Sequence, residues 1–571
     1  MFPTSVTFVT SYFDVYSGTN TERTVNWRIQ QFHNIAKTGI PICLYTSSDL
    51  IESFREFPNV KIMKTIDIRD TWTSKTVQEH PDSITLPDVR NLTKDTKEYI
   101  LCMNAKLDFM ADTILENPWN STHFAWIDFS ISYIFKDLSY LQRQLKILSS
   151  ATLSNDFLAI PGCWKNSSLD CDNHYTNNVN WRFCGGFFLG NEARVRDFCQ
   201  SYRENFPRFL NKTKKLVWEV NIWAWMEHHS LCNFNWYKGD HTDLILAVPE
   251  EFIYGGCSQI VSVIRYPYPE IKHFHATSPT YICHEGRHWL NTRYVNYSIT
   301  PNGGYIYLDG SQIIKNHNIV TELFLDTDQN LLPITNDFRI MDEITVRLPE
   351  LTPNSYSLGL EDIRIYSLNG RMRFIATNLN YSPVGRNRMV VGDYDPVCAT
   401  YANCLVVIPP NPMSVCEKNW TPIVRQGEEL FIYQWSPMEI GKIVDGHLVI
   451  VEKIETPFPW FDHFRGSTIF EPLNGEDESM DKSKLIGLVH FSIEGRPRHY
   501  YHCLVVLDSV SFKPLCYSTP FYFLNRGIEF CLGFTVQQDN YIFWISQCDR
   551  DPVMITVSKK SFRFLCCDNI V

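Results

Sequence analysis

The sequence lacks the features that mark several large classes of protein. No run approaches the roughly 18 consecutive apolar residues of a membrane-spanning helix, so no membrane span is expected. The first residues, MFPTSVTFVTSYFDVYSG, have neither a basic start nor a long apolar core, and they do not predict a signal peptide. The 18 cysteines form no CxxC pair, so without an export signal they are expected to be reduced thiols. These absences predict an intracellular, cytoplasmic protein.

Positive charge and nucleotide-binding loops are also scarce. The 52 Lys and Arg residues face 63 Asp and Glu, and the net charge of −11 argues against a general nucleic-acid binder. No GxGxxG follows the first predicted strand and no GxxxxGK[ST] occurs, which disfavours the dinucleotide-binding and P-loop folds. A chain of 571 residues, 44% hydrophobic and 20% charged, is instead typical of a globular protein with two to four domains.

Aromatic residues are plentiful. The chain has 15 Trp, 28 Tyr and 37 Phe, which together make 14% of its residues. Such an excess fits large β-sheet cores or surfaces that stack on sugar rings. Most Phe and Tyr fall in predicted strand centres. Trp126, Trp218, Trp420 and Trp435 adjoin candidate site residues and are the predicted sugar-stacking side chains.

The first half of the chain alternates predicted strands and helices. β-branched and aromatic runs mark the strands, and apolar residues at helical spacing mark the helices. This alternation favours a parallel, Rossmann-like sheet, whose ligands bind at the carboxyl ends of the strands. The predicted strands are residues 6–10, 40–45, 123–128 and 185–190, and the predicted helices are 22–37, 97–116, 138–148, 192–209 and 217–229.

Polar residues follow two of these strands. Thr10 follows Val9 in the first strand, and Asp128 follows Trp126 and Ile127 in another. A carboxylate at the carboxyl end of a strand can hold a divalent cation against a diphosphate. The alternative for Asp128 is a turn or a helix cap.

Several motifs in residues 3–250 carry a family resemblance. In order they are VTFVTSYFDV, CMNAKLDFM, AWIDFSISYIF, FCGGFFLGNEARVRDF, WEVNIWAW and YKGDHTD. This set resembles the HtrL/YibB-like family of bacterial and viral proteins. The resemblance implies a GT-A-type α/β fold and a glycosyltransferase that uses a nucleotide sugar.

The same resemblance implies roles for single residues. Asp128 would take the metal and sugar-nucleotide position, with His241 beside Asp240 at a metal or phosphate edge, so Mn²⁺ or Mg²⁺ is the expected cofactor. Ser130 stands where a DxD motif would place its second acid, which leaves metal dependence open. Glu219 is the base candidate, or else a first-turn helix acid. The donor- and sugar-binding residues implied in this half are Thr10, Asn104, Lys106, Asp128, Gly185 and Gly186.

The second half repeats a short strand pattern. The strands centred on Phe374, Phe431, Ile486 and Ile542 lie 57, 55 and 56 residues apart. This period suits a four-stranded propeller blade with its loops, and GGYIYLDG at 303–310 is a possible earlier blade strand. A β-sandwich is the competing all-β prediction.

Charged clusters precede these strands, and in order they carry a second resemblance. In order, the segments are GLEDIRIYSLNGRMRFIATN, EKNWTPI, FIYQWSP, FRGSTIFEP, LVHF, GIEFCLGF and YIFWISQCDRD. This set resembles the five-bladed β-propeller phosphorylases and transferases of β-mannosides, glycoside hydrolase family 130 and its relatives. In that family an EDPR segment carries the general acid, which corresponds to Asp362, with Ile363 in place of Pro. The residues implied to bind phosphate, a leaving group or sugar are Arg364, Lys418, Asn419, Arg465, His490, Glu529 and Asp549.

The implied reaction is an inverting displacement with one protein acid. Asp362 would protonate the glycosidic oxygen while phosphate attacks the anomeric carbon, and the reverse reaction would build a glycoside. No general base is needed to activate phosphate, in contrast to the paired carboxylates of ordinary glycosidases. No cofactor is expected for this half.

Together these patterns predict a two-domain enzyme. We expect a GT-A-like domain at 1–254, a connector at 255–298 and a five-bladed propeller at 299–571. The function expected is a bifunctional glycosyltransferase that takes a nucleotide sugar or sugar phosphate donor and a glycan acceptor, with no nucleic-acid partner. The alternatives are one catalytic half with a carbohydrate-binding or scaffolding half, or a structural protein with two decayed domains.

Overall fold

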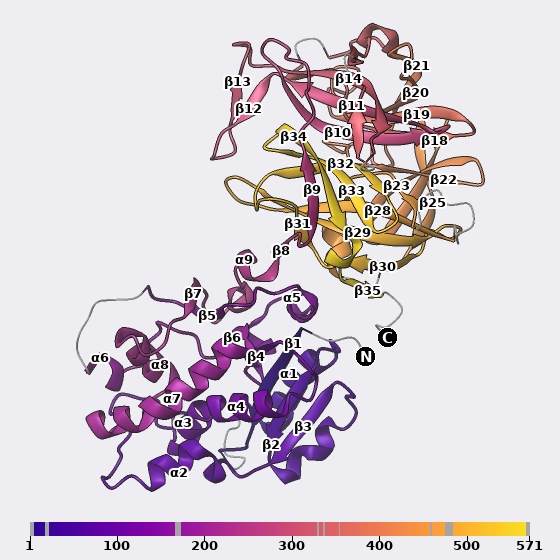
Figure 1. Cartoon of the computed structure of the whole chain (residues 1–571). Helices are drawn as coiled ribbons and strands as arrows, with labels where there is room; N and C mark the ends of the chain where they lie inside the picture. Colours follow the sequence, from indigo (N-terminus) through magenta and orange to yellow (C-terminus); the bar gives the residue numbers. More distant parts are fainter. Residues whose placement is uncertain are drawn as a thin grey trace. The chain divides into compact units, whose positions relative to one another are not determined.

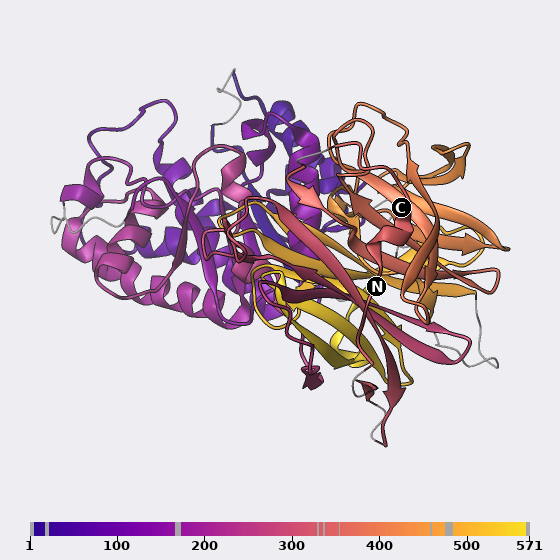
Figure 2. The same cartoon turned by 90° about the horizontal axis from the view of Figure 1, so that it is seen from above.

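The computed structural model describes residues 5–16, 22–165, 173–327, 330–334, 337–352, 355–456, 459–473 and 483–566. The chain divides into two structural units, Met1–Gly255 and Gly256–Val571. The first unit mixes helices and strands, and the second is built from β-sheets (Figures 1 and 2). Among the described residues, no helix combines the length and apolar character that crossing a membrane requires.

A seven-stranded sheet forms the centre of the first unit, in the order β3-β2-β1-β4-β6-β5-β7 (Figure 1). The strands from β3 to β4 are parallel, but β6 runs antiparallel to both β4 and β5. The expected parallel sheet is therefore found in part, with β6 reversed, because a buried strand has the same composition in either direction. The strands are β1 (Val6–Tyr12), β2 (Ile42–Thr46), β3 (Val60–Thr65), β4 (His123–Ile127), β5 (Leu158–Gly162), β6 (Phe187–Asn191) and β7 (Asn235–Lys238).

Helices pack against this sheet. Helix α4 contacts β1 and β4, and α7 contacts β6, α4 and α8. Phe188 of β6, Phe198 of α7 and Trp223 of α8 meet edge to face, so aromatic rings fill the space between these elements. The helices are α1 (Val25–Ala36), α2 (Trp72–Gln78), α3 (Lys97–Asn104), α4 (Lys106–Glu116), α5 (Leu138–Ser150), α6 (Asn173–Thr176), α7 (Glu192–Thr213), α8 (Glu219–His228) and α9 (Glu250–Ile253), with short 3₁₀ turns η1 (Ser48–Phe54), η2 (Ile68–Asp70), η3 (Ile131–Ile134) and η4 (Asp243–Leu246).

The helix predicted over 97–116 is broken at Ala105 into α3 and α4. The Asn104 side chain donates to Ile100 O (2.9 Å) and to Val217 O (2.8 Å), which ties the end of α3 to the segment before α8. The break makes Lys106 the first residue of α4. An apolar stripe alone could not reveal this interruption, since both helices continue the same buried face.

The second unit has a propeller-like arrangement of largely antiparallel sheets. Three sheets have four strands, in the orders β18-β19-β20-β21, β22-β23-β24-β25 and β32-β33-β34-β9. Two larger sheets follow the paths β10-β11-β14-β15 and β26-β28-β29-β30-β35, each with short strands added at the side, and β12 pairs with β13. Successive strands within a four-stranded sheet are neighbours, as short hairpins require.

These strands cover most of the second unit. In the sheet that begins at β10 and in the small sheet they are β10 (His275–His284), β11 (Arg287–Val295), β12 (Tyr297–Ile299), β13 (Tyr305–Tyr307), β14 (Ile314–Leu325), β15 (Leu331–Pro333), β16 (Arg339–Ile340) and β17 (Ser357–Leu358). In the next two sheets they are β18 (Glu361–Leu368), β19 (Arg371–Asn378), β20 (Arg388–Asp395), β21 (Thr400–Val407), β22 (Thr421–Arg425), β23 (Glu428–Trp435), β24 (Met438–Val444) and β25 (His447–Ile454). The remaining elements are β26 (Arg465–Gly466), β27 (Glu471–Pro472), β28 (Lys484–Ile493), β29 (His499–Asp508), β30 (Pro514–Ser518), β31 (Phe521–Tyr522), β32 (Glu529–Val536), β33 (Asn540–Gln547), β34 (Arg550–Ser558) and β35 (Phe564–Cys566), with β8 (Gly255–Gly256) at the unit boundary and 3₁₀ turns η5 (Glu343–Val346), η6 (Pro459–His463) and η7 (Lys559–Ser561).

The last four-stranded sheet takes its outer strand from the start of the unit. Strand β9 (Ile260–Ile264) pairs antiparallel with β34, almost 300 residues later in the chain. Pairing of the two ends leaves fewer open strand edges in the ring of sheets. The stretch 255–298, expected as a connector, thus contributes β9, β10 and β11 to the sheets of the second unit.

The four predicted repeat centres each lie in a different sheet. Phe374 is in β19, Phe431 in β23, Ile486 in β28 and Ile542 in β33, and all four are at most 1% exposed. The predicted four-stranded sheet is found at Phe374, Phe431 and Ile542, whereas the sheet that holds Ile486 has eight strands. The segment at 303–310 instead contains β13, which pairs with β12, and its Tyr305 and Ile306 are exposed.

Candidate functional site

Lys106 joins three elements of the first unit. Its Nζ donates to Gly185 O (2.7 Å) and to Glu219 Oε1 (2.8 Å), and it lies 3.0 Å from Asp128 Oδ1. Lys106 begins α4, Glu219 begins α8 and Asp128 follows β4, so three predicted site residues meet here. Burial by itself lowers the pKa of the ammonium, but the carboxylates of Asp128 and Glu219 outweigh it and raise the pKa above its ordinary value. Lys106 is therefore a charged, enclosed cation.

The two carboxylates differ in access to solvent. The Glu219 side chain is 7% exposed, whereas that of Asp128 is 37% exposed. Asp128 Oδ1 also accepts from Trp126 Nε1 (2.8 Å), which fixes the orientation of its carboxylate. In this arrangement Asp128 can touch a ligand, and Glu219 is enclosed behind Lys106.

Gly185 and Gly186 lie against this cluster. A Cβ at Gly185 would stand 2.2 Å from Glu219 Oε1, so no other residue fits beside the carboxylate. A Cβ at Gly186 would lie 3.5 Å from Asp128 Oδ2, and the Asp128 N–H donates to Gly186 O (2.9 Å). The double glycine thus allows the backbone to approach both carboxylates, and its role in lining a sugar site stays a prediction.

Two other predicted donor-binding residues are enclosed by the fold. Thr10 and Asn104 are both 1% exposed. The Oγ1 of Thr10, inside β1, has no hydrogen-bond partner among the described residues. The Asn104 amide bonds the backbone as described above, and its Oδ1 accepts from Tyr202 Oη (2.9 Å). Both side chains support the sheet and helices behind the site.

The predicted metal ligands are not joined. Asp128 and His241 share no hydrogen bond or ion pair, and within the described part of the chain no three His, Cys, Asp or Glu residues gather as a metal site would need. Asp240 accepts from Cys163 Sγ (3.4 Å), and the His241 ring packs on Trp181. Asp128 Oδ1 and Glu219 Oε1 are already in contact with the Lys106 ammonium. This donor set does not fit a divalent cation.

Asp362 occupies an irregular position in the second unit. The β18–β19 register shifts between Glu361 and Arg364, and Asp362 adopts a left-handed φ of 53°. Arg293 Nη1 donates to Asp362 Oδ1 (2.8 Å), and Arg293 Nη2 lies 3.6 Å from Glu361 Oε2. The bulge aims the carboxylate of Asp362 away from the ladder and toward a buried guanidinium.

Asp549 joins the same acidic group from the turn between β33 and β34. It accepts from Tyr297 Oη (2.8 Å). Burial raises the pKa of its carboxyl group, and the nearby acids Asp362 and Glu361 raise it further, while Arg293 and Tyr297 act in the opposite direction. The adjacent Glu361 and Asp362 and the distant Asp549 thus lie near one arginine, Arg293.

Arg364 is a structural support of this region. It is fully buried, and it donates to Ser467 O (2.7 Å), Gly466 O (2.9 Å), Asn419 Oδ1 (3.1 Å) and Asp362 O (3.3 Å). Burial lowers the pKa of its guanidinium to about 10. Arg364 therefore acts by fixing the backbone of Asp362 and the segment that carries Arg465.

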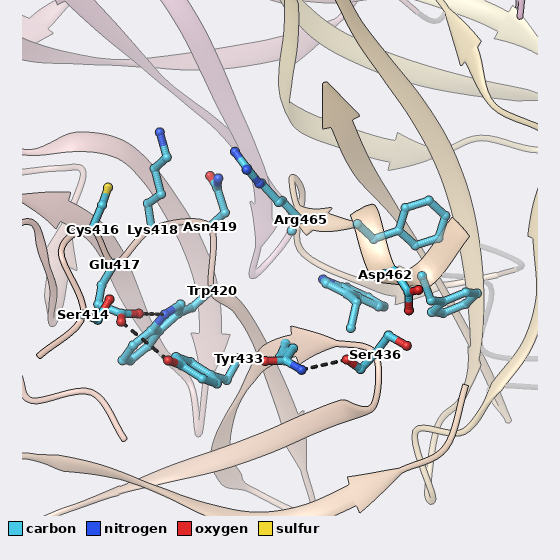
Figure 3. Close-up of a pocket in the computed structure, with 15 residues that line it drawn as sticks. Ser414, Cys416, Glu417, Lys418, Asn419, Trp420, Tyr433, Ser436, Asp462 and Arg465 are labelled. Carbon is cyan, nitrogen blue, oxygen red and sulfur yellow. Dashed lines mark hydrogen bonds between the residues drawn. The ribbon is translucent and has the colours of Figure 1, made fainter. Parts of the chain in front are cut away.

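Two exposed cations lie beside a cavity of about 480 Å³. Lys418, Asn419 and Arg465 line one edge of it in Figure 3, and Asp462 lies on another part of its wall. Among the described residues no carboxylate pairs with Lys418 or Arg465, whereas Arg293, Arg373 and Arg425 of this unit each pair with one. Asn419, with a left-handed φ of 64°, links the edge to Arg364. Unpaired cations at a cavity are suited to hold an anion.

His490 and Glu529 are more deeply placed. His490 is 2% exposed and shares a hydrogen bond with Ser467 Oγ through Nδ1 (2.8 Å). Its pKa lies well below the usual range, mainly because it is buried and also because His502 and nearby Arg and Lys side chains disfavour a second positive charge. Its ring is therefore neutral. Glu529 is 1% exposed and accepts from the backbone N–H groups of residues 523–525 and from Gln547. Glu529 thus fixes a loop.

The four predicted sugar-stacking tryptophans are at most 6% exposed. Trp126 donates to Asp128, and Trp420 donates to Glu417 Oε2 (3.0 Å) at the wall of the cavity (Figure 3). Trp420 meets Tyr433 edge to face. These rings position polar residues and fill the core, because both of their faces are covered by protein.

Sequence reasoning missed Arg293 and Tyr297. Arg293 lies in β11 and Tyr297 begins β12, and both fall inside the stretch that was expected to be a connector. The signal was present, since the segment WLNTRYVNY is rich in aromatic and β-branched residues, and a strand would have suggested a blade with its own inward charges.

Comparison with known proteins finds one matching family model. Residues 4–244 match a family model described as a bacterial protein of unknown function, HtrL_YibB. No curated protein sequence matches the chain.

Similar solved structures cover about half of the chain. A mannose phosphorylase from Leishmania mexicana, in complex with phosphate ion, has 12% identity and a TM-score of 0.34 over 55% of this chain and 94% of its own. A β-1,2-mannobiose phosphorylase from Listeria innocua has 10% identity and a TM-score of 0.34, over 52% and 98%. A GDP-Man-dependent mannosyltransferase from Leishmania mexicana has 10% identity and a TM-score of 0.32, over 52% and 90%. The predicted similarity of the first half to the HtrL/YibB-like family is confirmed over residues 4–244.

Proposed function

We propose that this chain is a carbohydrate-active enzyme that builds a glycan through two sites. The first unit transfers a sugar from a nucleotide sugar on a GT-A-type fold. The second unit, a propeller of five blades if the sheet of β10 and β11 is counted with the other four, carries out an inverting transfer that involves a phosphate-bearing sugar. The observation that carries the proposal is in the second unit, where Arg364 links the backbone of Asp362 to Asn419 at the edge of the cavity that carries the unpaired Lys418 and Arg465.

The second-unit residues suit one displacement reaction. Asp362 gives its carboxyl proton to the glycosidic oxygen as the bond from that oxygen to the anomeric carbon breaks. A phosphate oxygen, held by Lys418 and Arg465, forms the new bond on the opposite face of the sugar, so the configuration inverts. In the reverse direction the sugar phosphate loses phosphate, and Asp362 takes the proton of the attacking acceptor hydroxyl. Arg293 holds the Asp362 carboxylate at 2.8 Å in either direction.

The first-unit residues suit donor binding. Asp128 is the exposed carboxylate of the cluster, and the double glycine lets the backbone lie close beside it. Glu219, the base candidate, is enclosed and bonded to Lys106, so we assign it a positioning role. The motifs shared with the HtrL/YibB-like family support the transferase assignment for this unit.

The test is a transfer assay on the full chain. Nucleotide sugars and sugar 1-phosphates are screened as donors with glycan acceptors, and release of nucleoside diphosphate and inorganic phosphate is measured separately. We expect Asp362→Asn to lower phosphate-linked turnover by at least about 100-fold. Asp445→Asn is the matched control, because Asp445 is an exposed hairpin residue that also has a left-handed φ.

Asp128→Asn separates the two sites. It is expected to abolish transfer from nucleotide sugars and to leave phosphate-linked turnover within twofold of the parent protein. If both Asp variants retain both activities, the assignment of these residues is refuted. If no donor is turned over but glycans bind, the second unit is a binding module.

Anion binding at the cavity has its own test. Lys418→Met and Arg465→Met are each expected to weaken inorganic phosphate binding by about 10-fold or more, measured by calorimetry, since each removes one charge-assisted contact. Lys484→Met, an exposed lysine of β28, is the control and should leave binding unchanged. If Lys418→Met and Arg465→Met bind phosphate as tightly as Lys484→Met and the parent protein, the proposed anion site is refuted.

A further inference from the structure

The Lys106 ammonium lies where a divalent cation would have to sit to be shared by Asp128 and Glu219. We propose that Lys106 is the resident cation of the first-unit site and that Asp128 binds hydroxyl groups of the donor directly, without Mn²⁺ or Mg²⁺. The inference rests on the proposed transferase role of this unit and defines how its donor is held.

The hydrogen-bonding capacity of Lys106 is fully used. An ammonium has three N–H donors, and three oxygens lie within 3.0 Å of Nζ: Gly185 O, Glu219 Oε1 and Asp128 Oδ1. These distances are those of charge-assisted bonds. A divalent ion bound to the same two carboxylates would lie within a few ångströms of the ammonium and would be repelled by it.

Few protein ligands remain for a hard cation. Mg²⁺ and Mn²⁺ favour an octahedral set of oxygens, to which proteins contribute one or two carboxylates while substrate phosphates and water complete the set. Ser130 stands two residues after Asp128, where a second acid would be needed. Asp240 and His241 are engaged with Cys163 and Trp181. Lys106 contacts Oδ1 of Asp128 and Oε1 of the enclosed Glu219, so Asp128 is the carboxylate of this pair that a ligand can reach.

The backbone is shaped around the ammonium. Gly185 gives its carbonyl to Nζ, and the missing Cβ of the same residue leaves the space that Glu219 Oε1 occupies. The break at Ala105 places Lys106 on the first turn of α4, so its side chain reaches the other two elements. One glycine and one helix break therefore serve the same contact.

A purely structural ion pair would be expected to be closed on all sides. Lys106 and Glu219 are closed, but the Asp128 side chain is 37% exposed. Its Oδ1 is held by Lys106 and by Trp126 Nε1, which leaves Oδ2 oriented and accessible. An oriented carboxylate oxygen without a metal is a good acceptor for a sugar or ribose hydroxyl.

The test measures Mn²⁺ binding to the full chain by electron paramagnetic resonance of the free ion, which needs no activity. We expect Asp128→Asn to leave Mn²⁺ binding unchanged. Lys106→Met is expected to create a Mn²⁺ site that Lys106→Met/Asp128→Asn lacks. Lys64→Met, an exposed lysine paired with Asp112, is the control and should create none. A Mn²⁺ site in the parent protein that Asp128→Asn removes would overturn the proposal.

Nucleotide binding gives a second measurement that does not depend on the Lys106 variant folding. UDP and GDP are titrated into the parent protein in EDTA and in Mn²⁺, and affinities within twofold of each other are expected. A 10-fold or larger gain with Mn²⁺ that is lost in Asp128→Asn would also overturn the proposal. If neither nucleotide binds, the transferase role fails, and the Mn²⁺ titration still decides the role of Lys106.

Discussion

Replacing Lys106 by Met should destabilise the first unit strongly. Met has a similar length and no charge, so the substitution removes the cation and leaves the space filled. Lys106 is 1% exposed, and the Glu219 side chain behind it is 7% exposed. The variant therefore contains a carboxylate that has lost its partner and cannot reach water.

The size of the effect follows from these exposures. Removal of one partner of a buried ion pair costs about 3–5 kcal/mol, because the remaining charge stays desolvated. Asp128 adds little, since its side chain is 37% exposed and keeps the bond from Trp126. We expect Lys106→Met to lower the free energy of unfolding by about 3–5 kcal/mol. The pKa of Lys106 lies above its ordinary value, so Lys106 stays charged as the pH rises to about 10, the ordinary pKa of lysine, and the loss is the same from pH 6 to pH 9.

A double-mutant cycle separates the ion pair from other effects. In Lys106→Met/Glu219→Gln the uncompensated charge is gone, so the double variant should be more stable than Lys106→Met by about 1–3 kcal/mol. Urea unfolding of the full chain is followed by hydrogen exchange of first-unit peptides, which assigns the transition to that unit. A loss below about 1 kcal/mol in Lys106→Met, or losses that simply add in the double variant, would refute the reasoning.

Three further substitutions test other parts of the structure. Burial raises the pKa of Asp108 to about 6, so the folded state loses stability as the pH rises from about 4 to about 6. The free energy of unfolding of Asp108→Asn, measured in urea, should gain about 3 kcal/mol relative to that of the parent protein between pH 4 and pH 7. Burial likewise raises the pKa of Glu343 to about 7, and Glu343→Gln should keep the bond from Tyr381 while it stabilises the second unit at pH 8 more than at pH 5, measured by thermal unfolding. Gly185→Ala should displace Glu219 and abolish first-unit transfer, whereas Gly39→Ala, where nothing lies within 4 Å, should affect stability alone.

Local patterns predicted most elements of the fold. The β-branched run after Ser5 forms β1, and the strand before Asp128 forms β4, each within two residues of its predicted end. The regular spacing of Phe374 and its counterparts predicted one sheet per repeat. These features depend on short stretches of sequence, where composition and spacing decide the local structure.

Features that depend on distant partners were not predictable. The reversed direction of β6 leaves no mark on composition, and the break at Ala105 depends on a bond from Asn104 to a residue 113 positions away. Arg293 was missed because its strand pairs with others across the unit. A residue type shows that a side chain can bond, but only the fold shows which partner it meets.

The same limit separates the predicted site residues into two groups. Residue type selected Arg364 and Glu529 as ligand-binding groups, and the structure buries both with protein acceptors or donors around them. Lys418 and Arg465 are charged residues too, but they are exposed at a cavity and pair with no acid among the described residues. A charge whose bonds are satisfied inside the fold supports the site, and a charge left unsatisfied at a cavity is free to bind a ligand. For this reason the phosphate-binding variants at Lys418 and Arg465, and not substitutions at Arg364, distinguish an active second unit from a decayed one.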